Sequence, residues 1–392
     1  MGNFPEIPFI EKLLLDLIPF MTHDRIWLLI RLLIFPGILF ASVMVWPNVW
    51  IERKMWGRIH DRRGPTHIGF RGILQLMADF IKLLSKEVII PKNAHKVVFR
   101  LIPMASLFIA FMAFSLLPFD ENWALFYNTD TPNLDCSAVG GILPSGCNYL
   151  NYDLLLLFAL LTAIPVLGLL AGWAAGSKYP IIGGWRFANQ QFAIEVPLLL
   201  STLGPAILTG SLSLMVISVT QQANVWFIFI LPLSFITFAA AGIASVGRWP
   251  FDIHEADSEI VLGPRTEYSG ALFMMAFMGQ YVEIFMFTGT IVTFWLGGGQ
   301  LIPFISNFDL PLIGGIITDY SWLPIPAFIF IGKMVGVFII FIIITNTLHR
   351  IRMDQILRLM WRILIPLTLI NIMGVMLGIA LFPGFREFLG LM

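Results

Sequence analysis

The sequence predicts an all-α polytopic membrane protein with eight transmembrane helices and a further amphipathic helix at the membrane surface. Of its 392 residues, 58% are hydrophobic and only 12% are charged, and the mean hydropathy is +0.84. Soluble domains typically carry about 25% charged residues, so these values indicate that the bilayer is the solvent of this chain. Its long continuous apolar runs favour helices and exclude a β-barrel, whose strands alternate apolar and polar residues.

The predicted spans follow from the apolar runs, because a membrane-spanning helix needs roughly 20 apolar residues. They cover residues 27–50, 98–118, 153–173, 191–217, 225–246, 271–296, 326–347 and 363–384. No soluble domain remains between them, so residues 1–392 are predicted to form a single membrane domain. The first 25 residues mix acidic and apolar side chains, which favours an interfacial helix over a secretory or transit peptide.

The basic residues are concentrated in alternate loops. Of the 24 Lys and Arg, 19 lie in residues 51–100, 174–190, 247–270 and 348–362. The opposite loops contain none: 119–152, 218–224 and 297–325. The positive-inside rule therefore places the basic loops in the cytoplasm or its organellar equivalent, and both termini outside. Cys136 and Cys147 then lie outside, either as a disulfide or as two free thiols.

The segment 70–87 is predicted to be the amphipathic helix. Its polar residues recur at helical spacing, namely Arg71, Gln75, Asp79, Lys82 and Lys86, and the remaining face is apolar. The segment is too charged to span, so it lies in the headgroup layer or beside the bundle. Docking of a soluble partner, entry of an amphiphilic substrate, and anchoring to lipid headgroups all stay open.

Carboxylates gather in residues 248–270, on the face where Lys and Arg otherwise dominate. They are Asp252, Glu255, Asp257, Glu259 and Glu267. Crowded carboxylates raise one another's pKa, so some of them could exchange protons near neutral pH. The alternative is an acidic loop that is solvated or that pairs with the basic residues of 51–100.

Ionisable residues that fall inside predicted spans include Glu195, Glu283 and Lys333. Such groups are costly in the bilayer and often mark ion or proton pathways. A neutral carboxyl group, hydrogen-bonded between helices, is the alternative for each glutamate. No nucleotide-binding or hydrolytic motif is present, two cysteines cannot hold an iron–sulfur cluster, and no facing histidine pair is available for haem.

Several ordered motifs resemble one family, the membrane subunit of respiratory complex I that is numbered 1 in mitochondria and lettered H in bacteria. The first motifs are Glu52-Arg53-Lys54, Arg62-Arg63-Gly64-Pro65, and residues 72–87 with Gln75, Asp79, Lys82 and Glu87 in place. The later ones include Arg186, Gln190 and Glu195, then Arg248, Phe251, Asp252, Glu255, Asp257, Glu259 and Glu267. The chain departs from the family pattern at Thr66, Gly176, Ser245 and Gln280; the last two replace glutamates found in many members.

The resemblance implies a chamber, shared with peripheral-arm subunits, that a quinone headgroup enters from the bilayer. The residues implied at this chamber or its entrance are Glu52, Arg53, Arg62, Arg63, Lys82, Arg186, Arg248 and Phe251. Proton transfer is implied for Glu195, Asp79 and the five carboxylates of the acidic loop. Glu283 is added on its position alone, because it follows Gln280 by one helical turn and could replace the missing acid.

No cofactor is expected on this chain, while flavin and iron–sulfur clusters are implied in partner subunits. The implied partners are peripheral-arm, antiporter-like and small membrane subunits, quinone and lipids, without nucleic acid. The implied location is an energy-transducing membrane, either a bacterial or archaeal plasma membrane or an inner membrane. The alternatives are the anchor of a membrane-bound hydrogenase or of another quinone- or phenazine-linked dehydrogenase, and a stand-alone secondary transporter.

Overall fold

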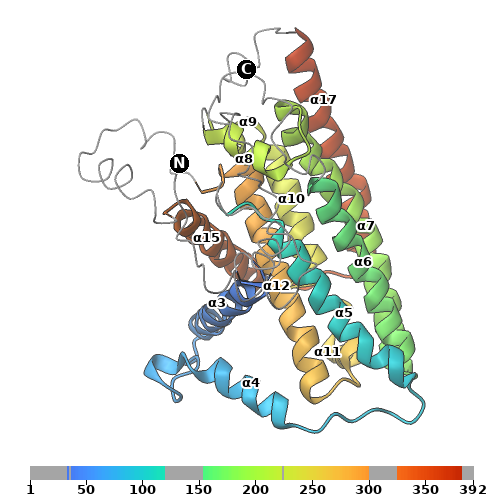
Figure 1. The fold of residues 1–392 in the computed structure, drawn as a ribbon. Helices are drawn as coiled ribbons and strands as arrows, with labels where there is room; N and C mark the ends of the chain where they lie inside the picture. The colour runs from blue at the N-terminus through green and yellow to red at the C-terminus, as the bar shows by residue number, and fades with distance from the viewer. Residues whose placement is uncertain (1–32, 35–36, 120–152, 223–224, 300–324, 382–392) are drawn as a thin grey trace, which may run out of the picture.

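A computed structural model describes residues 33–34, 37–119, 153–222, 225–299 and 325–381, and all regular elements within these ranges are helical. Helix α12 (Gly270–Trp295) runs through the middle of the bundle (Figure 1), and every residue from Gly279 to Trp295 is buried. A helix that is apolar on all sides needs neighbours all round. Its neighbours include α5 (Lys96–Ser115), α15 (Ile325–Thr347) and α3 (Ile38–Ile59).

A second group of helices packs beside this centre. It consists of α6 (Asp153–Ala174), α7 (Lys178–Thr209), α10 (Pro232–Ser245) and α17 (Ile365–Leu381). Helices α6 and α7 approach closely because small residues face each other, as is common in membrane bundles. A Cβ atom on Gly172 would lie 2.3 Å from the carbonyl oxygen of Pro180, so a larger residue there would push the two helices apart.

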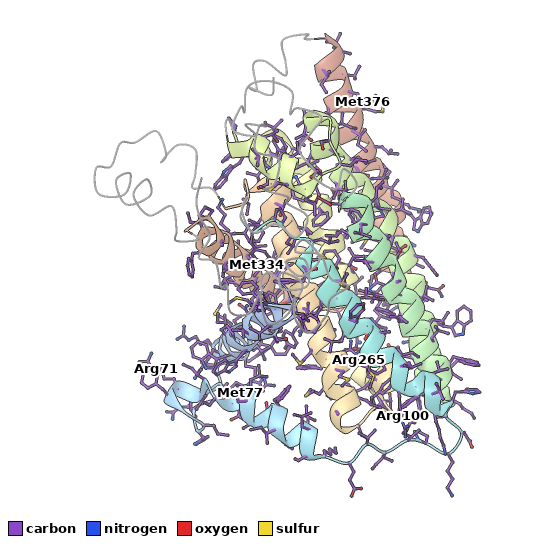
Figure 2. The ribbon with its side chains drawn as sticks, viewed as in Figure 1. Arg71, Met77, Arg100, Arg265, Met334 and Met376 are labelled. Atoms are coloured by element: carbon purple, nitrogen blue, oxygen red, sulfur yellow. The ribbon has the colours of Figure 1, made fainter. Side chains whose placement is uncertain are left out.

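The predicted amphipathic helix is confirmed as α4 (Gln75–Ser85), which crosses the lower end of the bundle in Figure 1. A short 3-10 turn, Phe70–Gly72, precedes it. The indole Nε1 of Trp46 in α3 donates a hydrogen bond of 2.8 Å to the carbonyl oxygen of Ile73, which fixes the start of α4 against α3. Figure 2 shows Arg71, Arg100 and Arg265 at this end of the molecule and Met376 at the other.

Six helices in the described part of the chain are long and apolar enough to cross a membrane. They are Lys96–Ser115, Asp153–Ala174, Lys178–Thr209, Gly270–Trp295, Pro326–Thr347 and Met353–Leu381. The chain is therefore a multi-pass membrane protein. Helices α3 and α10 occupy the positions of the other two predicted spans, but α3 ends in charged residues and α10 is only 14 residues long. The count of eight transmembrane helices and the side of the membrane on which each loop lies stay predictions.

Several predicted boundaries were wrong. Residues 51–59 were predicted to be loop but belong to α3, and the predicted span 191–217 is interrupted between α7, which ends at Thr209, and α8 (Leu214–Gln222). Residues 178–190 were predicted to be loop but form the first turns of α7, a helix of 32 residues and so about 48 Å long, longer than the hydrocarbon core is thick. Residues 353–362 are likewise helical, in α16 (Met353–Leu359) and a π-helical segment (Met360–Leu364) leading into α17. The predicted span 225–246 is divided into α9 (Phe227–Ile230) and α10, which starts at Pro232.

Two of these errors have a clear physical cause. Polar residues at the start of α7 lowered the hydropathy, yet Gln190 and Gln191 are buried and bond to backbone carbonyl groups. Pro232 cannot donate the backbone hydrogen bond that would join α9 to α10, and it is tolerated because it stands in the first turn of α10. Cys136 and Cys147 lie outside the described residues.

Candidate functional site

An open, mainly apolar cavity lies between α3, α4 and α12. Its volume is about 550 Å³, in the range of small-molecule sites. Most of its lining is aliphatic or aromatic, including Val43 and Val49 of α3, Met77 of α4, and Phe273 and Phe277 of α12. We call it the α4 cavity.

Three charged residues predicted as site residues line the α4 cavity: Arg53, Asp79 and Lys82. The guanidinium Nη1 of Arg53 in α3 lies 2.6 Å from Oδ2 of Asp79 in α4. Both side chains are about one-third exposed, so water weakens this ion pair, and its main effect is to position α4 against α3. The structure therefore brings Arg53 and Lys82, predicted at the quinone entrance, to the same cavity as Asp79, predicted for proton transfer.

A buried ion pair stands between α3, α12 and the segment after α10. Nη1 of Arg248 lies 2.9 Å from Oε1 of Glu52, and the guanidinium lies 4.8 Å from the ring centre of Tyr281. Burial opposes the charge on Arg248, but Glu52 and the Tyr281 hydroxyl hold its pKa above the ordinary value. Tyr281 also lines the α4 cavity, so this pair lies directly behind the cavity wall.

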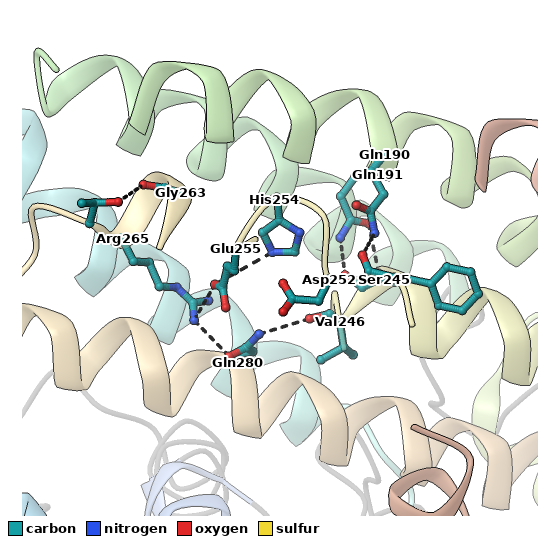
Figure 3. A network of polar contacts seen from close by, with 12 residues as sticks. Gln190, Gln191, Ser245, Val246, Asp252, His254, Glu255, Gly263, Arg265 and Gln280 are labelled. Carbon is teal, nitrogen blue, oxygen red and sulfur yellow. Dashed lines mark hydrogen bonds and ion pairs between the residues drawn. The ribbon is translucent and has the colours of Figure 1, made fainter. Parts of the chain in front are cut away.

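A second cavity, of about 90 Å³, lies on another side of α12. We call it the α12 cavity. It is lined by α5, α6, α7, α12 and the acidic loop, and its ionisable lining residues are His254, Glu255, Arg265, Tyr268 and Glu283. Nη1 of Arg265 lies 2.9 Å from Oε1 of Glu255 and 2.9 Å from the amide oxygen of Gln280 (Figure 3). The Gln280 amide nitrogen donates in turn to the carbonyl oxygen of Val246 at 3.2 Å.

His254 is the most buried ionisable side chain of this loop, with 3% exposure. Its ring lies 4.6 Å from the ring of Phe187, and its Nε2 lies 3.9 Å from Oε1 of Glu255. Burial lowers its pKa to about 4; Glu255 opposes this change, whereas Arg265 and Arg350 add to it. The folded protein therefore holds a neutral imidazole at ordinary pH.

This lowered pKa predicts a loss of stability in acid. The pKa of His254 is about 4 in the folded state and 6.5 for an ordinary histidine. The stabilisation is complete above pH 6.5 and is lost as pH falls toward 4, because the unfolded chain then binds the proton more tightly. The full effect is about 3 kcal/mol. We expect the unfolding temperature of the wild-type protein to fall more steeply between those pH values than that of His254→Gln; parallel curves would contradict this.

Glu195 lies on α7 beside a narrow third cavity that Gln191 and Ser245 also line. Its Oε1 is buried and has no hydrogen-bond partner among the described residues. Ser245 lines the α12 cavity as well, and its hydroxyl donates to the amide oxygen of Gln191 at 3.2 Å. Polar groups therefore run from Glu283 and Gln280, past Ser245 and Gln191, to Glu195.

Comparison with known proteins shows the family to which this chain belongs. Residues 30–376 match the family model described as NADH dehydrogenase. The chain belongs to this family. The NADH-quinone oxidoreductase subunit designated H from Dehalococcoides mccartyi (strain CBDB1) is 35% identical over 353 residues, which cover 90% of this chain and 87% of the relative. The protein of the same name from Geobacillus kaustophilus (strain HTA426) is 34% identical over 340 residues, or 86% of this chain and 90% of the relative.

Other predicted site residues of this NADH dehydrogenase family member lie outside the three cavities. Nη1 of Arg186 and Oε2 of Glu259 form an exposed ion pair of 2.5 Å, and this bond lowers the pKa of Glu259. Glu267 accepts a hydrogen bond of 2.9 Å from the hydroxyl of Ser177.

The remaining predicted residues are exposed, partly buried, buried or outside the described residues. Arg62 and Arg63 are exposed on the turn after α3. Phe251 is buried, and its carbonyl oxygen accepts a hydrogen bond from Gln190 at 2.9 Å. Asp252 is partly buried, and its backbone carbonyl accepts from Arg350. The side chain of Asp257, at the start of α11 (Asp257–Ile260), lies outside the described residues.

The sequence-based prediction missed His254, Arg265 and Gln191. One signal was available, because residues 249–264 contain one histidine and no Lys or Arg, and Arg265 directly precedes Thr266 and Glu267. A lone histidine and a lone arginine among carboxylates are candidates for pairing inside the loop. Their burial against α7 and α12 could not be predicted from their order in the chain.

Proposed function

We propose that this chain is the membrane subunit of a proton-translocating NADH:quinone oxidoreductase in which a quinone enters through the α4 cavity. The observation that carries this proposal is the α4 cavity itself. It is large enough for a quinone ring, it is lined by apolar side chains suited to an isoprenoid tail, and it has Arg53, Asp79 and Lys82 on its wall. The relatives named as NADH-quinone oxidoreductase subunits favour this function over a hydrogenase anchor or a stand-alone transporter.

In this proposal the α12 cavity responds to the reduction of quinone. Reduction of a quinone to a quinol takes up two electrons and two protons. The quinol is neutral, but the side chains that supply the protons become more negative, so the charge near α12 changes until they are reprotonated. Arg248 and Arg265 are cations held by single carboxylates, Glu52 and Glu255. A change of charge in the quinone chamber alters the free energy of both pairs, and protons then move along Glu283 and Glu195 toward antiporter-like subunits.

In this proposal, partner subunits supply the remaining parts of the enzyme. Peripheral-arm subunits carry the flavin and the iron–sulfur clusters, and they complete the quinone chamber against the basic end of this single membrane domain. Small membrane subunits and lipids cover its sides, and the complex lies in an energy-transducing membrane. Arg62 and Arg63, which are exposed and line none of the three cavities, are proposed to contact the peripheral arm.

Filling the α4 cavity tests the entry route. Val43 of α3 lines the cavity, and Val43→Trp would place an indole inside it. We expect the KM for a long-tailed quinone to rise about tenfold or more, because overpacking an apolar site costs about 1–3 kcal/mol. Reduction of a water-soluble electron acceptor by NADH, which uses only the partner subunits, should be unchanged.

Val97→Trp is the matched control. Val97 is 71% exposed on α5 and lines none of the three cavities, so the same substitution there should leave quinone reduction at the wild-type rate. An unchanged KM in Val43→Trp would exclude the α4 cavity as the route. Absence of NADH-linked quinone reduction in the purified wild-type complex would exclude the function itself.

A further inference from the structure

The imidazole of His254 is held in a defined orientation at the wall of the α12 cavity. A Cβ atom on residue 247 would lie 2.0 Å from Cε1 of His254, so the ring occupies space that only glycine leaves free. Gly247 has a φ of +67°, a conformation that favours glycine as well. The ring of Phe187, 4.6 Å away, contacts the imidazole from α7. The ring is therefore fixed by its surroundings rather than loosely packed.

The two ring nitrogens have different surroundings. Nε2 lies 3.9 Å from Oε1 of Glu255, slightly beyond hydrogen-bonding distance. Nδ1 is buried and has no hydrogen-bond partner among the described residues. A buried nitrogen without a partner is costly unless water or a transferred proton satisfies it. The α12 cavity beside the ring, with a volume of about 90 Å³, has room for several water molecules.

Charged groups of both signs face the ring, and the arginines among them disfavour its protonation. Glu255 and Asp252 come from its own loop, Arg265 from the following segment, and Arg350 from the segment before α16. The two arginines and burial together hold the pKa of His254 near 4, against the opposing effect of Glu255. A neutral imidazole has one nitrogen that donates a proton and one that accepts a proton.

Other side chains between Glu255 and Glu283 are poor proton carriers. Gln280 is an amide, and both of its ends are already bonded, to Arg265 and to Val246. Arg265 keeps its proton at any physiological pH. Burial raises the pKa of Tyr268 above its ordinary value, so its hydroxyl also stays protonated. Among the described lining residues, His254 is therefore the side chain best suited to connect the two carboxyl groups.

We propose that His254 transfers protons between Glu255 and Glu283 across the α12 cavity. A proton from the Glu255 carboxyl group, or from water beside it, passes to one ring nitrogen. The other ring nitrogen releases its proton through cavity water to the Glu283 carboxylate, and the imidazole is left neutral as its other tautomer. Proton exchange with the cavity water restores the first tautomer. This inference rests on the proposed function, because quinone reduction supplies the driving force for proton transfer through His254.

The first test replaces His254 by glutamine in the assembled complex. His254→Gln keeps a polar side chain but cannot take up and release a proton. We expect NADH oxidation with a water-soluble acceptor to be unchanged and proton translocation linked to quinone reduction to fall about tenfold or more. His95→Gln is the matched control, because His95 is exposed and stacked on Trp173 at 4.5 Å, away from the α12 cavity. Wild-type translocation in His254→Gln would overturn the proposal.

The second test separates proton transfer from packing. His254→Gly leaves a space of the shape of the lost ring, which added imidazole can enter. Imidazole should restore proton translocation, whereas 1-methylimidazole should not, because one of its nitrogens is blocked. Equal restoration by both compounds, or by neither, would overturn the relay.

The same preparations separate this inference from the proposed function. Quinone-linked proton translocation by the wild-type complex reports the proposed function, and the loss in His254→Gln reports the relay. A wild-type complex that translocates protons, with a His254→Gln variant that does so equally well, overturns the relay alone. A wild-type complex without quinone-linked translocation overturns both.

Discussion

Replacing Glu195 by glutamine is expected to give an assembled complex that accepts electrons normally but translocates protons at least about tenfold more slowly. Glutamine keeps the size and the hydrogen-bonding capacity of the side chain and removes only its ability to ionise. Oε1 of Glu195 is buried with no hydrogen-bond partner among the described residues, and Gln191 and Ser245 lead from it to the α12 cavity. Proton uptake by proteoliposomes, measured beside NADH oxidation with a soluble acceptor, gives both rates.

Glu87→Gln provides the control for this experiment. Glu87 is exposed beyond the end of α4 and lines none of the three cavities, so removing its charge should leave both rates unchanged. Glu283→Gln in the Glu195→Gln background should lower translocation further if Glu283 has replaced the acid absent at Gln280. A Glu195→Gln complex that pumps at the wild-type rate would show that Glu195 is a structural acid only.

Arg248→Met is expected to destabilise the protein by about 3 kcal/mol, because it leaves the Glu52 carboxylate buried without its charged partner. Glu52 is 6% exposed, and its Oε2 has no hydrogen-bond partner among the described residues even in the wild-type structure. Methionine fills most of the volume of the arginine stem, so the loss reports the charge and the contact with Tyr281 rather than a cavity. The unfolding temperature of the purified complex measures it.

The double variant Arg248→Met, Glu52→Gln distinguishes this explanation from simple loss of packing. Without a buried charge on either side, it should be more stable than Arg248→Met alone, since neutral pairs avoid most of the desolvation cost. Effects of the two substitutions that simply add would contradict a coupled ion pair. The Tyr281 ring, 4.8 Å from the guanidinium, is the same in both variants and does not affect the comparison.

Hydropathy predicted the fold wherever helices stay inside the bilayer. The predicted spans 98–118, 153–173 and 271–296 match α5, α6 and α12 to within three residues at each end. Hydropathy failed where a helix continues beyond the apolar layer, as at the start of α7 and in α16. There, the polar residues form hydrogen bonds through buried side-chain amides or lie at the membrane surface. These contacts exist only in the folded packing, so hydropathy does not reveal them.

Many residues of the site could be predicted from the sequence, but the ion pairs that they form could not. The resemblance to the family implied Arg53 and Lys82 at the quinone entrance and Asp79 in proton transfer, and in the structure all three line one cavity. The Glu52–Arg248 pair joins residues 196 positions apart, and no periodicity in the sequence specifies such a contact. Likewise, Arg186 and Glu259 form an exposed pair instead of lining the cavities, although the neighbouring Phe187 lines the α12 cavity.

Helix α12 lies between the two cavities, and two consecutive residues of it line different cavities. Gln280 lines the α12 cavity, while Tyr281 lines the α4 cavity. Successive residues of a helix lie about 100° apart on one rigid rod, so a turn of this rod about its own axis cannot move one without the other. A rotation of α12 that displaces Tyr281 from the wall of the α4 cavity would therefore also displace Gln280 from Arg265.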